Sequence, residues 1–182
     1  MTATAIAECH IRQFFEGHPV QLKQWAAGPA ANAIPDFRVL EIAPGPRLDQ
    51  WTYATAGAAD VGLRRLEYLT IGDEARDTYV ELLTMVAYYA MDHRLGLGHI
   101  IPIGRPLVDG SPCEHVYLSL PYLFGPKLEV IERSPESVQI LWVFPITQPE
   151  RQLLLSSGLD ALEERLESQE VQYWSPLRAS VV

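Results

Sequence analysis

The residues best suited to chemistry lie in one short segment, DGSPCEH, at positions 109–115. Asp109, Ser111, Cys113 and His115 are residue types that combine a nucleophile with a general base. Catalysis would require Ser111 or Cys113 within hydrogen-bond reach of His115. However, Asp-Gly-Ser-Pro is also the composition of a tight turn. We therefore predict a turn here and keep a small hydrolase as an alternative.

The same segment contains two possible metal ligands. Cys113 and His115 are two residues apart on a predicted strand, so we expect their side chains to point the same way. Zinc requires further ligands, and Cys9 and His10 could supply them only if the first helix met this strand. We predict no metal site.

Acidic residues are concentrated near the C-terminus. They lie on the polar side of a helix predicted over residues 159–168 and just beyond it: Glu163, Glu164, Glu167 and Glu170. We expect this face to be solvated, without the apolar surroundings that raise the pKa of a catalytic acid. The face can still contact a basic partner.

No cofactor-binding motif stands out. Gly96-Leu-Gly98 follows a predicted helix, whereas a dinucleotide-binding glycine motif opens one. We predict no cofactor and no catalytic residue, and we do not expect an enzyme.

The composition restricts the partners. The 182 residues carry a net charge of −9, which disfavours binding to nucleic acid and suits a basic protein partner. No apolar run is long enough to span a membrane. The N-terminal MTATAIAECHIRQFF lacks the basic start of a signal peptide, and Cys9 and Cys113 are lone thiols. These features predict a cytoplasmic protein that does not bind membranes.

The segment 137–158, SVQILWVFPITQPERQLLLSSG, is the most informative about the fold. Val138–Phe144 is apolar on both alternating faces, which predicts a strand covered on both sides. We expect Pro145 to end strand pairing because proline has no N–H. Thr147 and Glu150 have the spacing of a capping box, and Gly158 can end the helix in a left-handed conformation.

The remaining pattern indicates an α+β fold with a mixed, mainly antiparallel sheet. A long central helix and C-terminal helices pack against it. We predict one domain over 1–182, with an N-terminal helix and loop at 1–36 and a core at 37–182. The predicted helices are 3–15, 77–95, 147–158 and 159–168. The predicted strands are 37–43, 50–56, 63–71, 99–104, 113–122, the weak 127–132, and 138–144; 18–35 is the loosest segment.

Aromatic side chains are candidate anchors of a protein interface wherever they are exposed. Most of the tryptophans and tyrosines are expected in the core. Together with the acidic helix face, the candidate partner-binding residues are Glu163, Glu164, Glu167, Tyr122 and Trp174.

Several blocks in order resemble the suppressor-of-fused domain family, specifically its single-domain bacterial members. The similarity runs from about Phe37 to the C-terminus and rests on WTYATAGAAD, LEYLTIG, ELLTMVAYYA, LGLGHIIPIGRP, GSPCEHVYLSLPYLFGP, VQILWVFPITQPER and YWSPLRASVV. The chain departs from the family at Thr55–Ala59: Thr-Ala-Gly-Ala-Ala stands where Thr-Ser-Gly-Met/Leu-Ser is common. If those hydroxyls bind a partner in the family, this chain lacks the ones at Ala56 and Ala59.

The resemblance implies a compact α+β domain without known enzymatic activity. Animal members clamp transcription factors between two domains through an added strand, and this chain has room for one domain. Bacterial relatives resemble immunity proteins of polymorphic-toxin systems. We therefore hypothesise an immunity protein that binds and neutralises a cognate toxin, and the net charge of −9 suits a basic toxin domain. The alternative is a regulatory module that binds an extended peptide by strand addition.

Overall fold

A mixed sheet forms the centre of the computed structural model, which describes residues 2–34, 36–132 and 136–182. In these residues the sheet has eight strands in the order β1-β2-β3-β4-β8-β6-β5, with β7 also beside β8. Among the strands of the described residues, only β4 and β8 pair in parallel. This confirms the predicted α+β class with a mainly antiparallel sheet. The strands are β1 Val20–Lys23, β2 Arg38–Ile42, β3 Trp51–Ala56, β4 Leu66–Gly72, β5 Ile100–Pro102, β6 Cys113–Ser119, β7 Val130–Ile131 and β8 Val138–Thr147.

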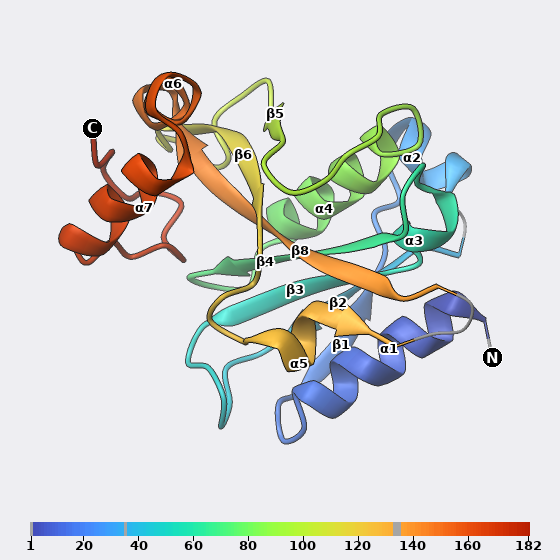
Figure 1. Ribbon diagram of the computed structural model, residues 1–182. Coiled ribbons are helices and arrows are strands. Elements are labelled where there is room, and N and C mark those ends of the chain that lie inside the picture. Colours follow the sequence, from blue (N-terminus) through green and yellow to red (C-terminus); the bar gives the residue numbers. More distant parts are fainter. Residues whose placement is uncertain (1, 35, 133–135) are drawn as a thin grey trace.

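Helices cover both faces of this sheet (Figure 1). The long helix α4 packs on one face, and α1, α5, α6 and α7 pack on the other. None of the helices in the described residues is long and apolar enough to cross a membrane. Their bounds are α1 Ala3–Phe14, α2 Gly28–Ala33, α3 Ala58–Val61, α4 Asp77–Tyr89, α5 Pro126–Glu129, α6 Gln148–Ser157 and α7 Leu159–Ser168.

Strand β8 contributes to the core on both sides of the sheet, as its apolar alternation predicts. Leu141 and Val143 belong to the cluster beneath α4. Ile140, Trp142 and Phe144 belong to the cluster beneath α1 and α7. Burial on both faces explains why polar residues are nearly absent from this strand.

Pro145 does not end the strand, contrary to the prediction. β8 continues to Thr147, and Pro145 pairs with Val116 of β6. Pairing of β8 with β4 ends at Trp142, so one side of the strand lacks a strand partner at Pro145 and needs no N–H there. The Pro145 carbonyl accepts a hydrogen bond from Arg178 Nη2 at 2.9 Å.

The helix after β8 begins as predicted. The Thr147 side chain accepts from the Glu150 N–H, and the Glu150 carboxylate accepts from the Thr147 N–H at 2.9 Å. This reciprocal pair is the capping box. The helix ends at Gly158, whose φ of +86° favours glycine.

Other predictions also differ from the structure. The strand predicted over 113–122 ends at Ser119. The segment 18–35 contains strand β1, which pairs with β2 over four residues; Pro35 lies outside the described residues. Helix α4 ends at Tyr89 rather than near Leu95. The strand predicted over 63–71 begins at Leu66. The strand predicted over 127–132 is the short helix α5 followed by β7, because Pro126 favours the first turn of a helix.

Candidate functional site

An apolar groove of about 480 Å³ lies between helix α7 and the sheet. Its floor consists of two cross-strand pairs, Tyr117 opposite Phe144 and Ser119 opposite Trp142. The other lining residues come from the loop after β6, from α7 and from the C-terminal tail: Tyr122, Leu123, Leu159, Leu162, Glu163, Leu166, Glu167, Val171 and Tyr173. Strands β6 and β8 thus provide a rigid floor, while α7 and two irregular segments form the walls.

The rim of the groove is both apolar and acidic. Two consecutive large side chains lie at the rim with much of their surface accessible: Tyr122 is 58% exposed and Leu123 is 44% exposed. The acidic part of the rim consists of the Glu163 and Glu167 side chains on α7. Partial burial, with a smaller contribution from Asp160 and Glu167, raises the pKa of the Glu163 carboxyl. The prediction that this whole acidic face is solvated is therefore wrong for Glu163.

One floor residue has a buried polar atom that lacks a hydrogen-bond partner among the described residues. Trp142 is 7% exposed, and its indole Nε1 has no hydrogen-bond partner among the described residues. The ring contacts Phe144 and Tyr173 edge-on, with centroid distances of 5.1 and 5.6 Å. A buried donor of this kind is uncommon because an unmade hydrogen bond is costly.

The structure brings together three of the five predicted partner-binding residues, Tyr122, Glu163 and Glu167. Glu164 is exposed on α7 but does not line the groove. Trp174 is half-buried beside it, edge-on to Tyr173 at 4.9 Å. The floor residues could not be recognised as site residues from the sequence, because strand residues in the core and strand residues at a groove floor have the same alternating pattern.

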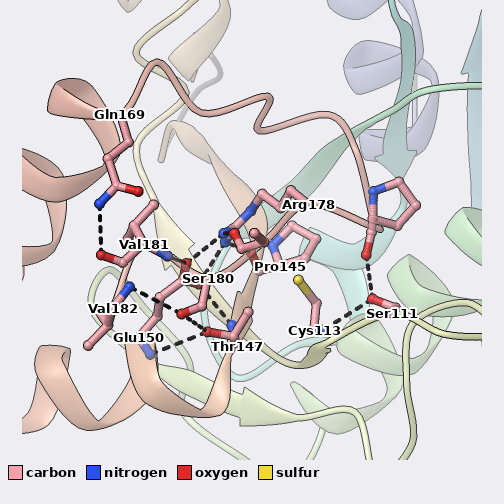
Figure 2. A network of polar contacts seen from close by, with 12 residues as sticks. Ser111, Cys113, Pro145, Thr147, Glu150, Gln169, Arg178, Ser180, Val181 and Val182 are labelled. Carbon is pink, nitrogen blue, oxygen red and sulfur yellow. Dashed lines mark hydrogen bonds and ion pairs between the residues drawn. The ribbon is translucent and has the colours of Figure 1, made fainter.

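The C-terminal tail, residues 169–182, forms one wall of the groove and is held by a polar network (Figure 2). The Arg178 guanidinium binds both carboxylate oxygens of Glu150, at 2.6 and 2.7 Å. Thr147 Oγ1 and Ser180 Oγ are 2.9 Å apart, and Gln169 donates to the Val181 carbonyl at 3.0 Å. The network therefore anchors the tail at residues before and after Tyr173 in the sequence.

The candidate catalytic residues of segment 109–115 do not form a nucleophile–base pair. Ser111 donates to the carbonyl of Pro176 and accepts from the Cys113 N–H, so its hydroxyl helps to hold the tail. Burial raises the pKa of the Cys113 thiol, which opposes its activation as a nucleophile. Asp109 is exposed.

Cys113 and His115 do not point the same way, contrary to the prediction. The register of β6 against β8 shifts between them, and such a bulge reverses the alternation of side chains. Cys113 packs in the cluster beneath α4, whereas His115 lines a cavity with Arg151 and Leu155 of α6. The geometry therefore does not support a Ser/Cys–His arrangement.

Metal-ligating side chains are also dispersed. Within residues 2–34, 36–132 and 136–182, no group of three or more His, Cys, Asp or Glu side chains could hold a metal ion. Cys9 is exposed on α1, and His10 Nε2 lies 3.2 Å from the carbonyl of Leu128. The first helix does not bring Cys9 or His10 to Cys113.

The Thr-Ala-Gly-Ala-Ala segment contributes to the core. The Thr55 hydroxyl donates to the buried Glu67 carboxylate and accepts from the Tyr68 N–H. The same carboxylate accepts from the N–H groups of Gly57, Ala58 and Ala59, at 2.9, 3.2 and 3.2 Å. The Thr55 hydroxyl is therefore satisfied within the protein.

This chain is similar to known proteins over most of its length. The immunity protein YqcF of Bacillus subtilis (strain 168) is 25% identical over 179 residues, which cover 92% of this chain and 91% of that protein. The crystal structure of a putative SUFU homologue from Neisseria gonorrhoeae FA 1090 matches with a TM-score of 0.85 and 28% identity. That match covers 99% of this chain and 97% of the homologue.

More distant structures share the fold. A chain of the Sufu–Fu complex matches with a TM-score of 0.71 at 14% identity, covering 98% of this chain and 91% of that one. The sequence model of the suppressor of fused protein (SUFU) family matches residues 35–179. On this evidence, the chain belongs to the suppressor of fused protein family.

Proposed function

We propose that this protein is a non-enzymatic binding domain that neutralises a cognate toxin by covering part of its surface. The observation that carries the proposal is the apolar groove with exposed Tyr122 and Leu123 at its rim and Glu163 and Glu167 beside them. Protein interfaces typically combine aromatic anchors in a pocket with a polar rim. The groove has this composition.

The comparisons support a protein partner. One relative is named an immunity protein, and one solved relative of the same fold is a chain of a protein complex. The net charge of −9 favours a basic partner, because complementary charge speeds encounter and disfavours wrong partners. The proposal places this binding in the cytoplasm, where Cys9 and Cys113 would remain reduced.

Co-purification with the product of the neighbouring reading frame tests the proposal. The tagged wild-type protein is expected to retain that product and to restore growth of cells that express it. A neighbour that carries no toxic activity, or a toxin that is neither retained nor neutralised, would count against the proposal. The Tyr122→Ala/Leu123→Ala variant should weaken retention, whereas Leu63→Ala, at a 57% exposed leucine outside the groove, should not.

A second candidate is recognition of an extended peptide by strand addition. Strand β5 is the last strand of the sheet on its side, and a cavity of about 500 Å³ runs beside it, lined by Leu97, His99, Ile100, His115 and Leu155 among others. An open sheet edge next to a cavity is the geometry that strand addition uses. However, β5 has three residues, and Pro102 has no N–H, both of which protect an edge from pairing.

Two matched variants separate the candidates. Leu155→Asp changes a 63% exposed side chain beside β5 and should disrupt strand addition. Tyr122→Ala changes the groove rim instead. Loss of partner binding by Leu155→Asp with full binding by Tyr122→Ala would favour strand addition at β5, and the reverse would favour the groove.

A further inference from the structure

We infer that the groove takes an apolar side chain from a partner segment in which Lys or Arg flanks that side chain. This inference rests on the proposed function, because it specifies the chemistry of the partner. The apolar floor and the acidic rim of the groove each account for one part of that chemistry.

The floor selects an apolar group. Tyr117, Phe144 and Leu162 line the groove with little polar surface around them, and α7 adds Leu159 and Leu166. A volume of about 480 Å³ lies within the range of sites that enclose a ligand group. An aliphatic or aromatic side chain that enters this space removes apolar surface from water on both partners.

The rim selects positive charge. Helix α7 carries Asp160, Glu163, Glu164 and Glu167 against a basic Arg165, which is exposed and does not line the groove. Glu163 and Glu167 border the apolar surface. Glu163 is half-buried among the lining residues, so its charge is incompletely solvated, and this burial also raises the pKa of its carboxyl. A Lys or Arg next to an inserted apolar side chain would compensate that charge, whereas an acidic segment would be repelled.

Peptide titration of the full-length protein tests this chemistry. Three heptapeptides share Gly-Ser flanks and differ at the centre: Lys-Leu-Lys, Glu-Leu-Glu and Lys-Gly-Lys. The readout is the set of indole N–H signals of the four tryptophans in a nitrogen–proton NMR spectrum, with Trp142 assigned by Trp142→Phe. The Trp142 signal should move saturably with Lys-Leu-Lys, at least threefold more weakly with Lys-Gly-Lys, and should not move with Glu-Leu-Glu.

A matched pair of variants tests the role of the rim. Glu163→Gln/Glu167→Gln should weaken binding of the Lys-Leu-Lys peptide by about 3- to 10-fold, the range expected for two partly exposed ion pairs. Glu164→Gln/Glu170→Gln removes the same charge from exposed positions outside the groove and should change binding less than about twofold. Equal responses to all three peptides, equal effects of the two variants, or no movement of the Trp142 signal would overturn the inference.

The outcome is distinguishable from failure of the proposed function. If the wild-type protein retains the neighbouring toxin and Glu163→Gln/Glu167→Gln retains it equally well, the groove inference is wrong while toxin binding stands. If the toxin is not retained but the Lys-Leu-Lys peptide binds at Trp142 with the expected selectivity, the groove chemistry is correct and the toxin partner is wrong.

Discussion

Arg178 and Glu150 form a buried, two-point ion pair between residues that lie 28 positions apart, with Nη1–Oε1 and Nη2–Oε2 distances of 2.6 and 2.7 Å. Glu150 also closes the capping box of α6, and it accepts the Val181 N–H at 3.1 Å. One carboxylate therefore starts a helix and fixes the C-terminal tail. Because that tail contains Tyr173, the pair positions one wall of the groove.

Arg178→Met should strongly destabilise the protein. The Glu150 side chain has no exposed surface and would lose its counter-charge, and breaking a buried pair from one side costs about 3–5 kcal/mol. Urea denaturation measures the loss. Arg105→Met breaks an ion pair with Glu81 at side chains that are 56% and 35% exposed, and should cost less than about 1 kcal/mol. Equal losses in the two variants would contradict a structural role for the buried pair.

Glu150 should also make stability fall on acidification. Burial by itself would raise the pKa of this carboxyl, but hydrogen bonds from Arg178, its positive charge and the N–H groups of Thr147 and Val181 hold the pKa below the ordinary 4.5. A pKa that is lower in the folded state stabilises the protein above about pH 4.5, and the contribution is lost as the pH falls through the folded-state pKa.

Glu150→Gln isolates this contribution. The variant should be less stable at pH 7, and the difference from the wild type should narrow as the pH is lowered from 5 to 3, because the wild type alone loses the charge of Glu150. Urea denaturation at a series of pH values provides the measurement. A constant difference over that range would show that the ionisation of Glu150 does not contribute.

Glu67→Gln should destabilise the protein by about 2–3 kcal/mol, because an amide NH₂ would replace an oxygen that faces hydrogen-bond donors. The carboxylate is 1% exposed and accepts from Thr55 and from three backbone N–H groups at the start of α3. Burial raises the pKa of this carboxyl above the ordinary 4.5, and the hydrogen bonds from these donors offset only part of that rise. Thermal denaturation measures the change. Exposed Glu164→Gln is the control and should stay within about 0.5 kcal/mol of the wild type.

The two cysteines should react at very different rates with a thiol reagent. Cys9 is exposed and Cys113 is 0% exposed, so the native protein should titrate one thiol quickly and the second after denaturation. Cys9→Ser should remove the fast reaction. Fast reaction of both thiols would show that the Ser111–Pro176 contact opens readily and exposes Cys113.

Much of the fold could be predicted because its signals are local. The spacing of Thr147 and Glu150 identifies the start of α6, since both partners of a capping box lie within one helical turn. The apolar alternation of Val138–Phe144 identifies a strand covered on both faces. Strand β1 was missed because four residues carry too little periodicity, and its pairing with β2 stabilises it.

The candidate site could be predicted only in part, because local patterns reveal accessible side chains but not how distant segments pack. Acidic side chains at helical spacing and an aromatic residue in a loop mark an accessible surface, which led to Glu163, Glu167 and Tyr122. The floor residues Tyr117 and Trp142 could not be separated from ordinary core residues. Their exposure to a groove depends on where α7 lies over the sheet, which no local pattern encodes.

The sequence by itself determined the class of this protein: its α+β elements, its acidic charge and its membership of a recognisable family. Tertiary structure decided which residues meet. It paired Arg178 with Glu150, turned Cys113 and His115 to opposite faces through a bulge, and placed Glu163 at the edge of an apolar groove. Periodicity and capping follow from neighbours within a few residues, whereas these contacts depend on the packing of segments that are distant in the chain.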